Sequence, residues 1–171
     1  MEELKKHIRN IQDFPKEGIL FRDITTLLKN KGSFREAIDV MTDKVRDKEV
    51  DLILGVESRG FIFAAPIAYN LGVPLNVIRK PGKLPAEVIS ESYTLEYGEN
   101  TIELHKDAIE KEDKVVIVDD LLATGGTALA SAHLVEKFGG KVSSLLFLIE
   151  LTELKGREKL KDYLVESVVK Y

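Results

Sequence analysis

Four short apolar runs constrain the fold of this chain more than any other feature. They are "DLILGV", "PLNVIRK", "KVVIVDD" and "KVSSLLFLIEL", which begin at Asp51, Pro74, Lys114 and Lys141. A continuous apolar run of this length between turn signals is typical of a strand buried on both faces of its sheet. The sequence therefore predicts four buried strands, and a last helix or edge strand in the charged tail.

Helical patterns separate these runs. Apolar residues recur at helical spacing from Phe34 to Val45, with Ser33 as the candidate N-cap. The segment "GFIFAAPIAYNLG" predicts a helix closed by Gly72, and Gly126 to Phe138 predicts another that ends at a Gly-Gly pair. Alternating strands and helices predict an α/β fold with a mainly parallel sheet flanked by helices.

The remaining segments are polar and irregular. Met1 to Asn10 predicts a short charged helix, and "DFPKEGILFRDIT" after it predicts a loop broken by Pro15 and Gly18. Lys80 to Asn100 predicts a long polar connection with a small hairpin around Tyr93 to Tyr97. Long ordered connections often serve as active-site lids.

Composition fits one globular domain over residues 1–171. The chain is 44% hydrophobic and 32% charged, without cysteine, internal repeats or a dividing linker. Its net charge of −4 argues against a broad surface for nucleic acid. Because no signal-peptide pattern or apolar run of transmembrane length occurs, we expect a cytoplasmic protein with no membrane partner.

The polar segment after the third apolar run carries the strongest functional signal. Ligands bind beyond the carboxyl ends of parallel strands, and "ESRG", "RKPGK" and "DDLLATGGT" all follow predicted strands. Gly125 and Gly126 let the backbone approach a ligand, and N–H groups at a helix start bind phosphate well. Thr124 and Thr127 add hydroxyl donors. An ordinary strand-to-helix turn is the alternative, since neither G-x-x-x-x-G-K-[ST] nor G-x-G-x-x-G occurs.

Asp119 and Asp120 stand directly before this turn. Carboxylates at a strand end can accept hydrogen bonds from the vicinal hydroxyls of a ribose. A phosphate in the turn and a ribose diol on the carboxylates describe a ribose 5-phosphate. The alternative is an acidic flank that complements the helix dipole, which accounts better for one aspartate than for two.

The segment "VVIVDDLLATGGTA" closely resembles the motif with which type I phosphoribosyltransferases bind phosphoribosyl pyrophosphate (PRPP). Five further segments resemble the adenine-specific members of that family, in matching order from about Gln12 to Leu160: "DFPKEGILFRDIT", "GVESRGFIF", "RKPGKLP", "SYTLEYG" and "ELTELKGREKL". The resemblance implies the type I phosphoribosyltransferase fold, with a small base-binding hood formed by about residues 1–33. It also implies transfer of ribose 5-phosphate from PRPP to adenine, which gives AMP and diphosphate.

The resemblance implies a cofactor and a partner as well. Mg²⁺ would accompany the reaction, held mainly by PRPP and by no dedicated protein cluster, since Mg²⁺ commonly keeps waters and substrate oxygens. A second copy of the chain would complete a homodimer.

The residues implied to bind PRPP come from all three strand tails and the lid. They are Arg59, Arg79, Lys80, Lys83, Tyr97, Asp119, Asp120, Ala123, Thr124, Gly125, Gly126 and Thr127. Judged by residue type alone, Arg59 can also be a surface arginine at a helix start. The cationic cluster "RKPGK" can likewise be a solvated loop, because charged side chains are mostly exposed.

The residues implied to bind adenine are Leu20, Phe21, Arg22 and Leu151. Phe21 can stack on the purine, and backbone groups of Arg22 can read its Watson–Crick edge. Glu96, Asp119 and Asp120 are the implied catalytic residues, with Glu96 handling the proton of the adenine imidazole ring. A solvated hairpin glutamate is the alternative for Glu96.

Two other functions share these features. One is a transferase for another purine, because base choice depends on few contacts. The other is a regulatory protein that keeps the fold, senses PRPP and binds nucleic acid. The negative net charge and the presence of Arg79, Lys83 and Glu96 argue against the regulatory protein.

Overall fold

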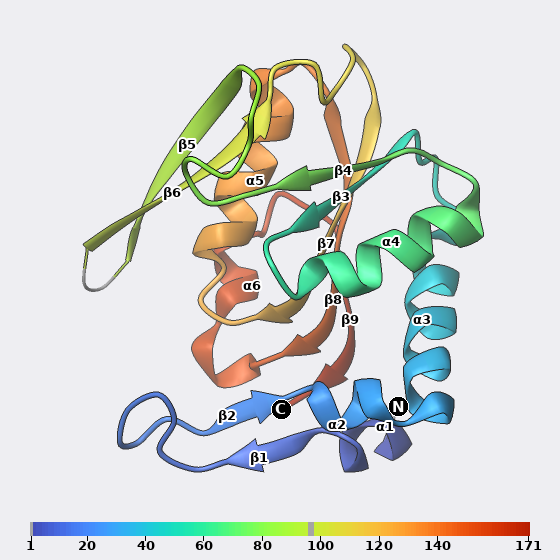
Figure 1. Cartoon of the computed structure of the whole chain (residues 1–171), viewed down its shortest axis with the longest axis vertical. Helices are drawn as coiled ribbons and strands as arrows, with labels where there is room; N and C mark the ends of the chain where they lie inside the picture. The colour runs from blue at the N-terminus through green and yellow to red at the C-terminus, as the bar shows by residue number, and fades with distance from the viewer. Residues whose placement is uncertain (1, 96–97) are drawn as a thin grey trace.

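A five-stranded parallel sheet forms the centre of the computed structural model, which describes residues 2–95 and 98–171 (Figure 1). The strand order is β4-β3-β7-β8-β9, and neighbouring strands all run parallel. The strands are β3 (Leu52–Val56), β4 (Leu75–Ile78), β7 (Lys114–Leu122), β8 (Lys141–Glu150) and β9 (Val165–Lys170). The first four are the predicted apolar runs and β9 is an edge strand in the tail, so the predicted α/β fold is confirmed.

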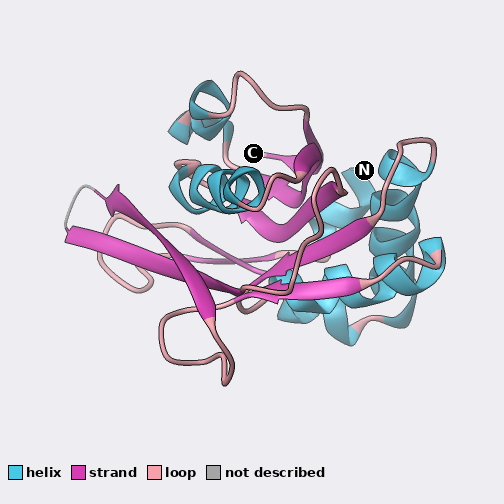
Figure 2. Ribbon diagram, turned by 90° about the horizontal axis from the view of Figure 1, so that it is seen from above, coloured by secondary structure: helices cyan, strands magenta, loops and turns pink. Residues whose placement is uncertain are grey.

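Helices cover both faces of this sheet (Figure 2). In β7 the side chains alternate, with Val116 and Val118 in one core and Val115 and Ile117 in the other. The first core is closed by α3 (Lys31–Arg46) and α4 (Gly60–Leu71). The second is closed by α5 (Gly126–Lys137) and by Leu160, which follows α6 (Gly156–Lys159).

The helix ends follow the predicted glycines but not the predicted N-cap. Gly72 ends α4 in the left-handed conformation, with φ of 69°. The prediction of Ser33 as the N-cap of α3 was wrong, because Asn30 Oδ1 accepts the amide hydrogens of Gly32 and Ser33 at 3.0 Å each. The Ser33 hydroxyl instead donates to the carbonyl of Leu27, 2.9 Å away in the preceding helix.

The segment before α3 forms a small layer beside the carboxyl ends of β8 and β9 (Figure 1). Its elements are α1 (Glu2–Lys6), β1 (Arg9–Ile11), β2 (Phe21–Asp23) and α2 (Thr25–Lys29). The predicted helix was therefore too long and the predicted loop contains a strand. The reason is a long-range contact, since β1 and β2 pair antiparallel and Arg9 binds Asp23 across them. We call residues 2–33 the hood.

A long hairpin projects from the sheet, formed by β5 (Val88–Leu95) and β6 (Gly98–His105). It is longer than the predicted hairpin around Tyr93 to Tyr97. It rests on α5 through Glu91, which binds His133 and Lys137, and through a 2.8 Å hydrogen bond between the hydroxyls of Tyr93 and Thr127. A single 3-10 turn, η1 (Thr152–Leu154), links β8 to α6. Within residues 2–95 and 98–171, we find no helix with the length and apolarity needed to cross a bilayer.

Candidate active site

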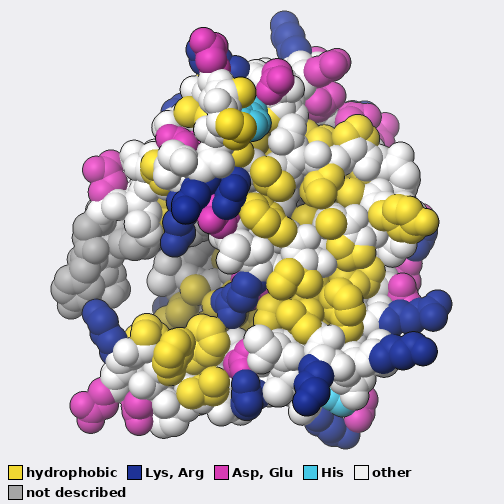
Figure 3. Space-filling view, in the orientation of Figure 1, with side chains coloured by type: hydrophobic (Ala, Val, Ile, Leu, Met, Phe, Trp, Pro, Cys, Tyr) yellow, Lys and Arg dark blue, Asp and Glu magenta, His cyan; other side chains and the backbone are white. Residues whose placement is uncertain are grey.

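The tails of β3, β4 and β7 line one polar cavity of about 350 Å³ at the carboxyl edge of the sheet. Its walls include Arg59, Lys80, Asp119, Asp120 and Thr127. A smaller pocket of about 80 Å³ lies in the turn from Leu121 to Ala128, and a cavity of about 520 Å³ extends beneath the hairpin. The surface is hollowed between the hairpin and the hood in Figure 3. The structure therefore brings the three predicted strand tails together.

Asp119 and Asp120 line this cavity side by side in sequence. The Asp120 amide donates to Asp119 Oδ1 at 2.8 Å, which holds the Asp119 carboxylate in place. Burial raises the pKa of Asp119 well above its ordinary value, and the charge of Asp120 raises it further. Burial also raises the pKa of Asp120, although Arg59 opposes that shift. Two carboxylates held at this energetic cost are typical of a ligand site rather than of a helix flank.

Arg59 is held toward this pair from the start of α4. Its Nη2 atom lies 2.9 Å from Asp120 Oδ2, but not with hydrogen-bond geometry. Among the described residues, Asp120 Oδ2 is buried without a hydrogen-bond donor. A buried acceptor of this kind is costly unless a ligand satisfies it. The guanidinium carbon of Arg59 also lies 5.3 Å from the ring centroid of Phe21, so Arg59 spans from the acidic pair to the hood.

The turn after β7 presents its backbone to the small pocket. Gly125 has a φ of 81°, a left-handed conformation that favours glycine, and α5 begins at the next residue. Among the described residues, the main-chain N–H groups of residues 124–127 donate no hydrogen bond. Free N–H groups at a helix start attract an anion through both hydrogen bonding and the helix dipole. This geometry favours an anion site over an ordinary turn.

Glycine is required where α4 meets the end of β7. A Cβ atom on Gly60 would lie 2.7 Å from the carbonyl oxygen of Val118 and 3.0 Å from Asp119 Oδ1. Only glycine therefore lets the "ESRG" segment approach the acidic pair this closely.

The cationic cluster after β4 is arranged by a residue that the sequence reasoning did not single out, Glu57. Its carboxylate accepts the Lys80 amide at 2.7 Å and two nitrogens of Arg79 at 3.3 Å each. Burial raises the pKa of Glu57, but these hydrogen bonds outweigh burial and leave the pKa lowered. Arg79 is thus committed to Glu57, whereas Lys80 lines the cavity and Lys83 is exposed.

Of the predicted adenine-binding residues, Phe21 and Leu151 lie near the site, Leu20 is exposed, and the Arg22 side chain is bonded elsewhere. Phe21 lies beside the cavity, with its ring edge-on to Phe14 at 5.1 Å, and Leu20 is exposed. Leu151 is half-buried and its amide donates to the carbonyl of Leu122 at 2.9 Å, next to the turn after β7. We call residues 123–127 of that turn the anion turn. The Arg22 side chain is occupied elsewhere, bonded to Asn10 and stacked 3.8 Å from the ring centroid of Tyr171.

Three predicted or overlooked residues remain. Glu96 and Tyr97 lie outside the described residues, so their roles stay predictions. Tyr93 was overlooked although it stands in the quoted segment "SYTLEYG". Its ring lies against Gly126, where an added Cβ would be 3.1 Å away, and its hydroxyl binds Thr127. Within the described ranges, no three His, Cys, Asp or Glu side chains gather as a metal-binding group.

A family model for the phosphoribosyl transferase domain matches residues 23–170. The chain belongs to the phosphoribosyltransferase family. An adenine phosphoribosyltransferase from Clostridium perfringens is 55% identical over 168 residues, which cover 98% of each chain.

Solved structures give the same relationship. An adenine phosphoribosyltransferase from Thermoanaerobacter pseudethanolicus is 54% identical and superposes with a TM-score of 0.97 over 99% of each chain. The enzyme from Saccharomyces cerevisiae, in complex with an imino-altritol bisphosphate and adenine, is 40% identical, with a TM-score of 0.91 over 98% of this chain and 97% of its own.

Proposed function

We propose that this chain transfers ribose 5-phosphate from PRPP to adenine and releases AMP and diphosphate. One observation carries the proposal: a buried acidic pair lines the cavity, and the turn that follows it presents N–H groups, unpaired among the described residues, to an adjoining small pocket that also contains Asp119 and Thr127. Together they offer one place for a ribose and one for a phosphate. Adenine is favoured over other purines by the full-length similarity to adenine phosphoribosyltransferases. A transferase for another purine is the remaining competitor.

The acidic pair is proposed to act on the sugar end of PRPP by stabilising positive charge. The bond from the anomeric carbon to the diphosphate oxygen breaks, and a bond to an imidazole nitrogen of adenine forms. Positive charge develops on the sugar in the oxocarbenium-like transition state, and Asp119 and Asp120 face that sugar. Fixed charges act strongly where water is excluded. The N–H groups of residues 124–127 hold the 5-phosphate and keep the sugar aligned.

Cationic side chains are proposed to bind the diphosphate end of PRPP. Arg59 and Lys80 line the cavity and can stabilise the negative charge that develops on the leaving group. Arg79 supports this end indirectly, because its pairing with Glu57 holds the backbone of Lys80 in place.

Phe21 supplies an aromatic face for the purine, and Glu96 is proposed to accept the imidazole proton of adenine. General acid–base help is worth ~10²–10⁴-fold, so Glu96→Gln should lower turnover by at least the smaller factor. PRPP affinity should change little, because the carboxylate would face the base. Turnover within about threefold of the parent, well below that range, would reassign the proton to another group or to water.

Magnesium is proposed as the cofactor. The two carboxylates, one of which has an oxygen without a hydrogen-bond donor among the described residues, fit an ion that takes most of its ligands from diphosphate and water. Bound there, Mg²⁺ would neutralise charge on the leaving group. A chelator should abolish turnover and added Mg²⁺ should restore it, and activity that survives chelation would reject this cofactor.

A second copy of the chain is the proposed partner. Hydrophobic side chains gather over α4 and β4 in Figure 3, and three of the large ones are exposed there: Ile62 by 37%, Tyr69 by 87% and Leu75 by 41%. An apolar surface of this kind marks an interface. Light scattering should give a dimer, and Tyr69→Lys with Leu75→Lys should shift it toward monomer.

We also propose a cytoplasmic location. PRPP carries several negative charges, and such an ion crosses a bilayer only with help. The enzyme should therefore work in the compartment that makes its substrate.

The deciding experiment is an assay of AMP formation from PRPP and Mg²⁺ with adenine, hypoxanthine, guanine and xanthine in turn. The proposal expects efficient turnover with adenine alone. Preference for another base would keep the PRPP site and change the base assignment. PRPP binding without turnover of any base would support the regulatory alternative.

A further inference from the structure

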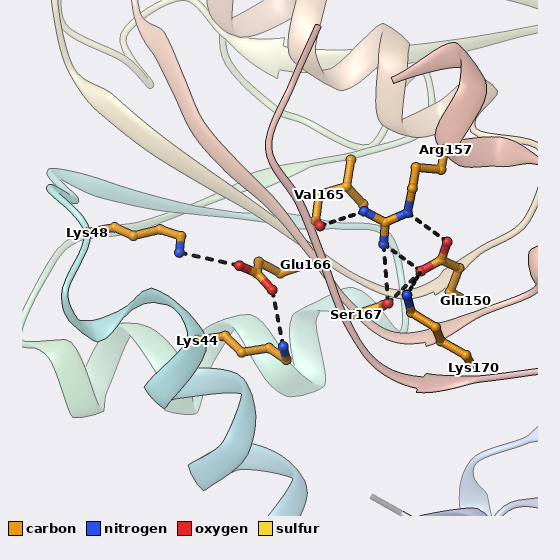
Figure 4. Close-up of polar contacts among 8 residues, drawn as sticks. All are labelled: Lys44, Lys48, Glu150, Arg157, Val165, Glu166, Ser167 and Lys170. Atoms are coloured by element: carbon orange, nitrogen blue, oxygen red, sulfur yellow. Dashed lines mark hydrogen bonds and ion pairs between the residues drawn. The ribbon is translucent and has the colours of Figure 1, made fainter. Parts of the chain in front are cut away.

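An ion pair with a buried carboxylate adjoins the anion turn through Gly156, and its side chains line neither the cavity nor the small pocket. Arg157 Nε donates to Glu150 Oε1 at 2.9 Å and Arg157 Nη2 donates to Glu150 Oε2 at 2.6 Å (Figure 4). The side chain of Glu150 is only 6% exposed. Two neighbours complete the arrangement: Ser167 donates to Glu150 at 2.5 Å, and Arg157 Nη1 donates to the carbonyl of Val165 at 2.8 Å.

The residue before Arg157 touches the turn itself. A Cβ atom on Gly125 would lie 2.6 Å from the carbonyl oxygen of Gly156. Conversely, a Cβ on Gly156 would collide with the carbonyl oxygen of Ala123 and lie 3.0 Å from the Gly125 nitrogen. Backbone is therefore packed on backbone with no side chain between them.

The helix that carries Gly156 cannot hold this position by itself. α6 is four residues long, and no side chain caps its start. A helix this short is unstable alone. Two anchors fix it: the buried side chain of Leu160 at its end and the bidentate pair between Arg157 and Glu150. Because Arg157 binds β8 and β9 together, it fixes α6 to the rigid sheet.

We infer that Arg157 and Glu150 are positioning residues for PRPP, which hold Gly156 against the backbone of residues 123–125 and so set the shape of the 5-phosphate site. This inference rests on the proposed function. Neither side chain lines the small pocket of the turn, so their effect is transmitted through Gly156.

A neighbouring ion pair supplies a matched control. Glu166, between Val165 and Ser167 on β9, binds Lys44 at 3.1 Å and Lys48 at 3.5 Å (Figure 4). These lysines belong to α3 and the residues after it, on the other side of the sheet from α6. Glu166→Gln therefore removes a partly buried carboxylate near Arg157 and leaves the contact of Gly156 with the turn in place.

Two variants test the inference from different ends. Gly156→Ala pushes on the turn directly, and Gly140→Ala is its control, a crowded glycine beyond the far end of α5. The double variant Glu150→Gln with Arg157→Gln removes both charges, so no unpaired charge stays buried and the chain can fold. Arg157→Lys keeps the charge but loses the two-pronged contact.

The measurements are PRPP binding by calorimetry without adenine, steady-state KM for each substrate, and thermal unfolding. Gly156→Ala and the double variant should weaken PRPP binding and raise its KM by ~10-fold or more, since small misplacements of a binding group are costly. For Arg157→Lys, the affinity for PRPP and the KM for PRPP should lie between those of these two variants and those of the parent. KM for adenine should stay within about threefold in each, as should both KM values in Glu166→Gln and Gly140→Ala.

A merely structural role would give a different result. It would lower the unfolding temperature of the double variant and of Glu166→Gln alike, with PRPP binding unchanged, and that result would overturn the inference. If the parent binds PRPP but makes no AMP, the proposed function fails while the positioning role still stands or falls on calorimetry. A parent that does not bind PRPP would overturn both.

Discussion

The turn after β7 and the hood both lie beside the acidic pair and Arg59, but they are held in opposite ways. The turn follows a buried strand directly, and its acids, glycines and threonines lie within nine consecutive residues, Asp119 to Thr127. The hood is tied together by contacts between residues far apart in the chain. Arg9 binds Asp23, Thr26 binds the His7 carbonyl at 2.6 Å, and Arg22 stacks on Tyr171.

This difference determines what a substitution can reach. In the turn, one residue change alters the ligand-facing chemistry and leaves the strand and helix intact. In the hood, the same change also loosens distant partners. Effects on the turn should therefore appear in turnover and PRPP binding, whereas effects on the hood should appear in adenine binding together with stability.

The largest expected effect is at the acidic pair. Asp119→Asn or Asp120→Asn should lower turnover by roughly 10²-fold or more, comparable to losing one preorganised electrostatic group. Asp39→Asn, an exposed residue on α3, is the control and should leave turnover unchanged. Near-parental rates in both variants would remove the pair from catalysis.

The same variants should gain stability. A raised pKa means that Asp119 stabilises the fold only when protonated, and that contribution is lost as pH rises through the raised value. At pH 7, Asp119→Asn should therefore unfold at a higher temperature than the parent, and the difference should shrink in acid. A lower unfolding temperature at pH 7 would assign the pair a structural role instead.

The second prediction tests the hood. Phe21→Ala should raise KM for adenine by ~10-fold, because base–aromatic stacking is worth ~1–3 kcal/mol. KM for PRPP should stay near the parental value. Phe34→Leu, which alters an aromatic ring packed against the core outside the hood's strands, should change neither KM. Equal effects of Phe21→Ala on both substrates would contradict the division between turn and hood.

The third prediction concerns Glu150, which supports the turn through its pair with Arg157. Hydrogen bonds from Arg157 dominate over burial and lower the pKa of Glu150 from 4.5 to about 2. Because the pKa of Glu150 is lower in the folded state than in the unfolded state, the ionised carboxylate stabilises the fold by about 3 kcal/mol at pH values above 4.5. This stabilisation is lost as the pH falls from 4.5 toward 2. Denaturant unfolding between pH 7 and pH 2 should show a flatter decline for the Glu150→Gln and Arg157→Gln double variant. Parallel pH profiles would show that the pair contributes no such stability.

The smallest effect is expected at the hairpin. Tyr93→Phe removes one hydrogen bond to Thr127, typically worth about 1 kcal/mol, and should loosen the hairpin from α5. Limited proteolysis of free protein should cut between Lys80 and Asn100 faster in this variant. PRPP with Mg²⁺ should slow cutting in the parent, since a ligand favours the state that it binds. Equal cutting with and without ligand would argue against a lid.

The contrast between local and long-range contacts explains which features could be predicted from the sequence and which could not. The strands and the anion turn were predictable because their signals are local: apolar runs, a Gly-Gly step and two adjacent acids. The start of α3 was misassigned because Asn30 and Ser33 both suit a cap, and only the path of α2 decides between them. The strands β1 and β2 carry three residues each and depend on pairing across a loop. Glu57 stayed hidden because its importance comes from Arg79, 22 residues away.

The attachment of the hood to the first core has a consequence for how ligands come and go. Leu4, Ile8, Ile24 and Leu27 of the hood are buried in the same cluster as residues of α3 and α4. Exposing four such side chains costs roughly 1.5–3 kcal/mol each, a sum comparable to the whole stability of a domain. The hood therefore cannot swing away as a body on each catalytic cycle. The hairpin is anchored at its base, where Ile102 and Leu104 are buried in the second core. Farther out, its described residues meet α5 through the Tyr93 ring on Gly126 and through the polar contacts of Tyr93 and Glu91. Adenine and PRPP should accordingly enter, and AMP leave, on the hairpin side of the cavity.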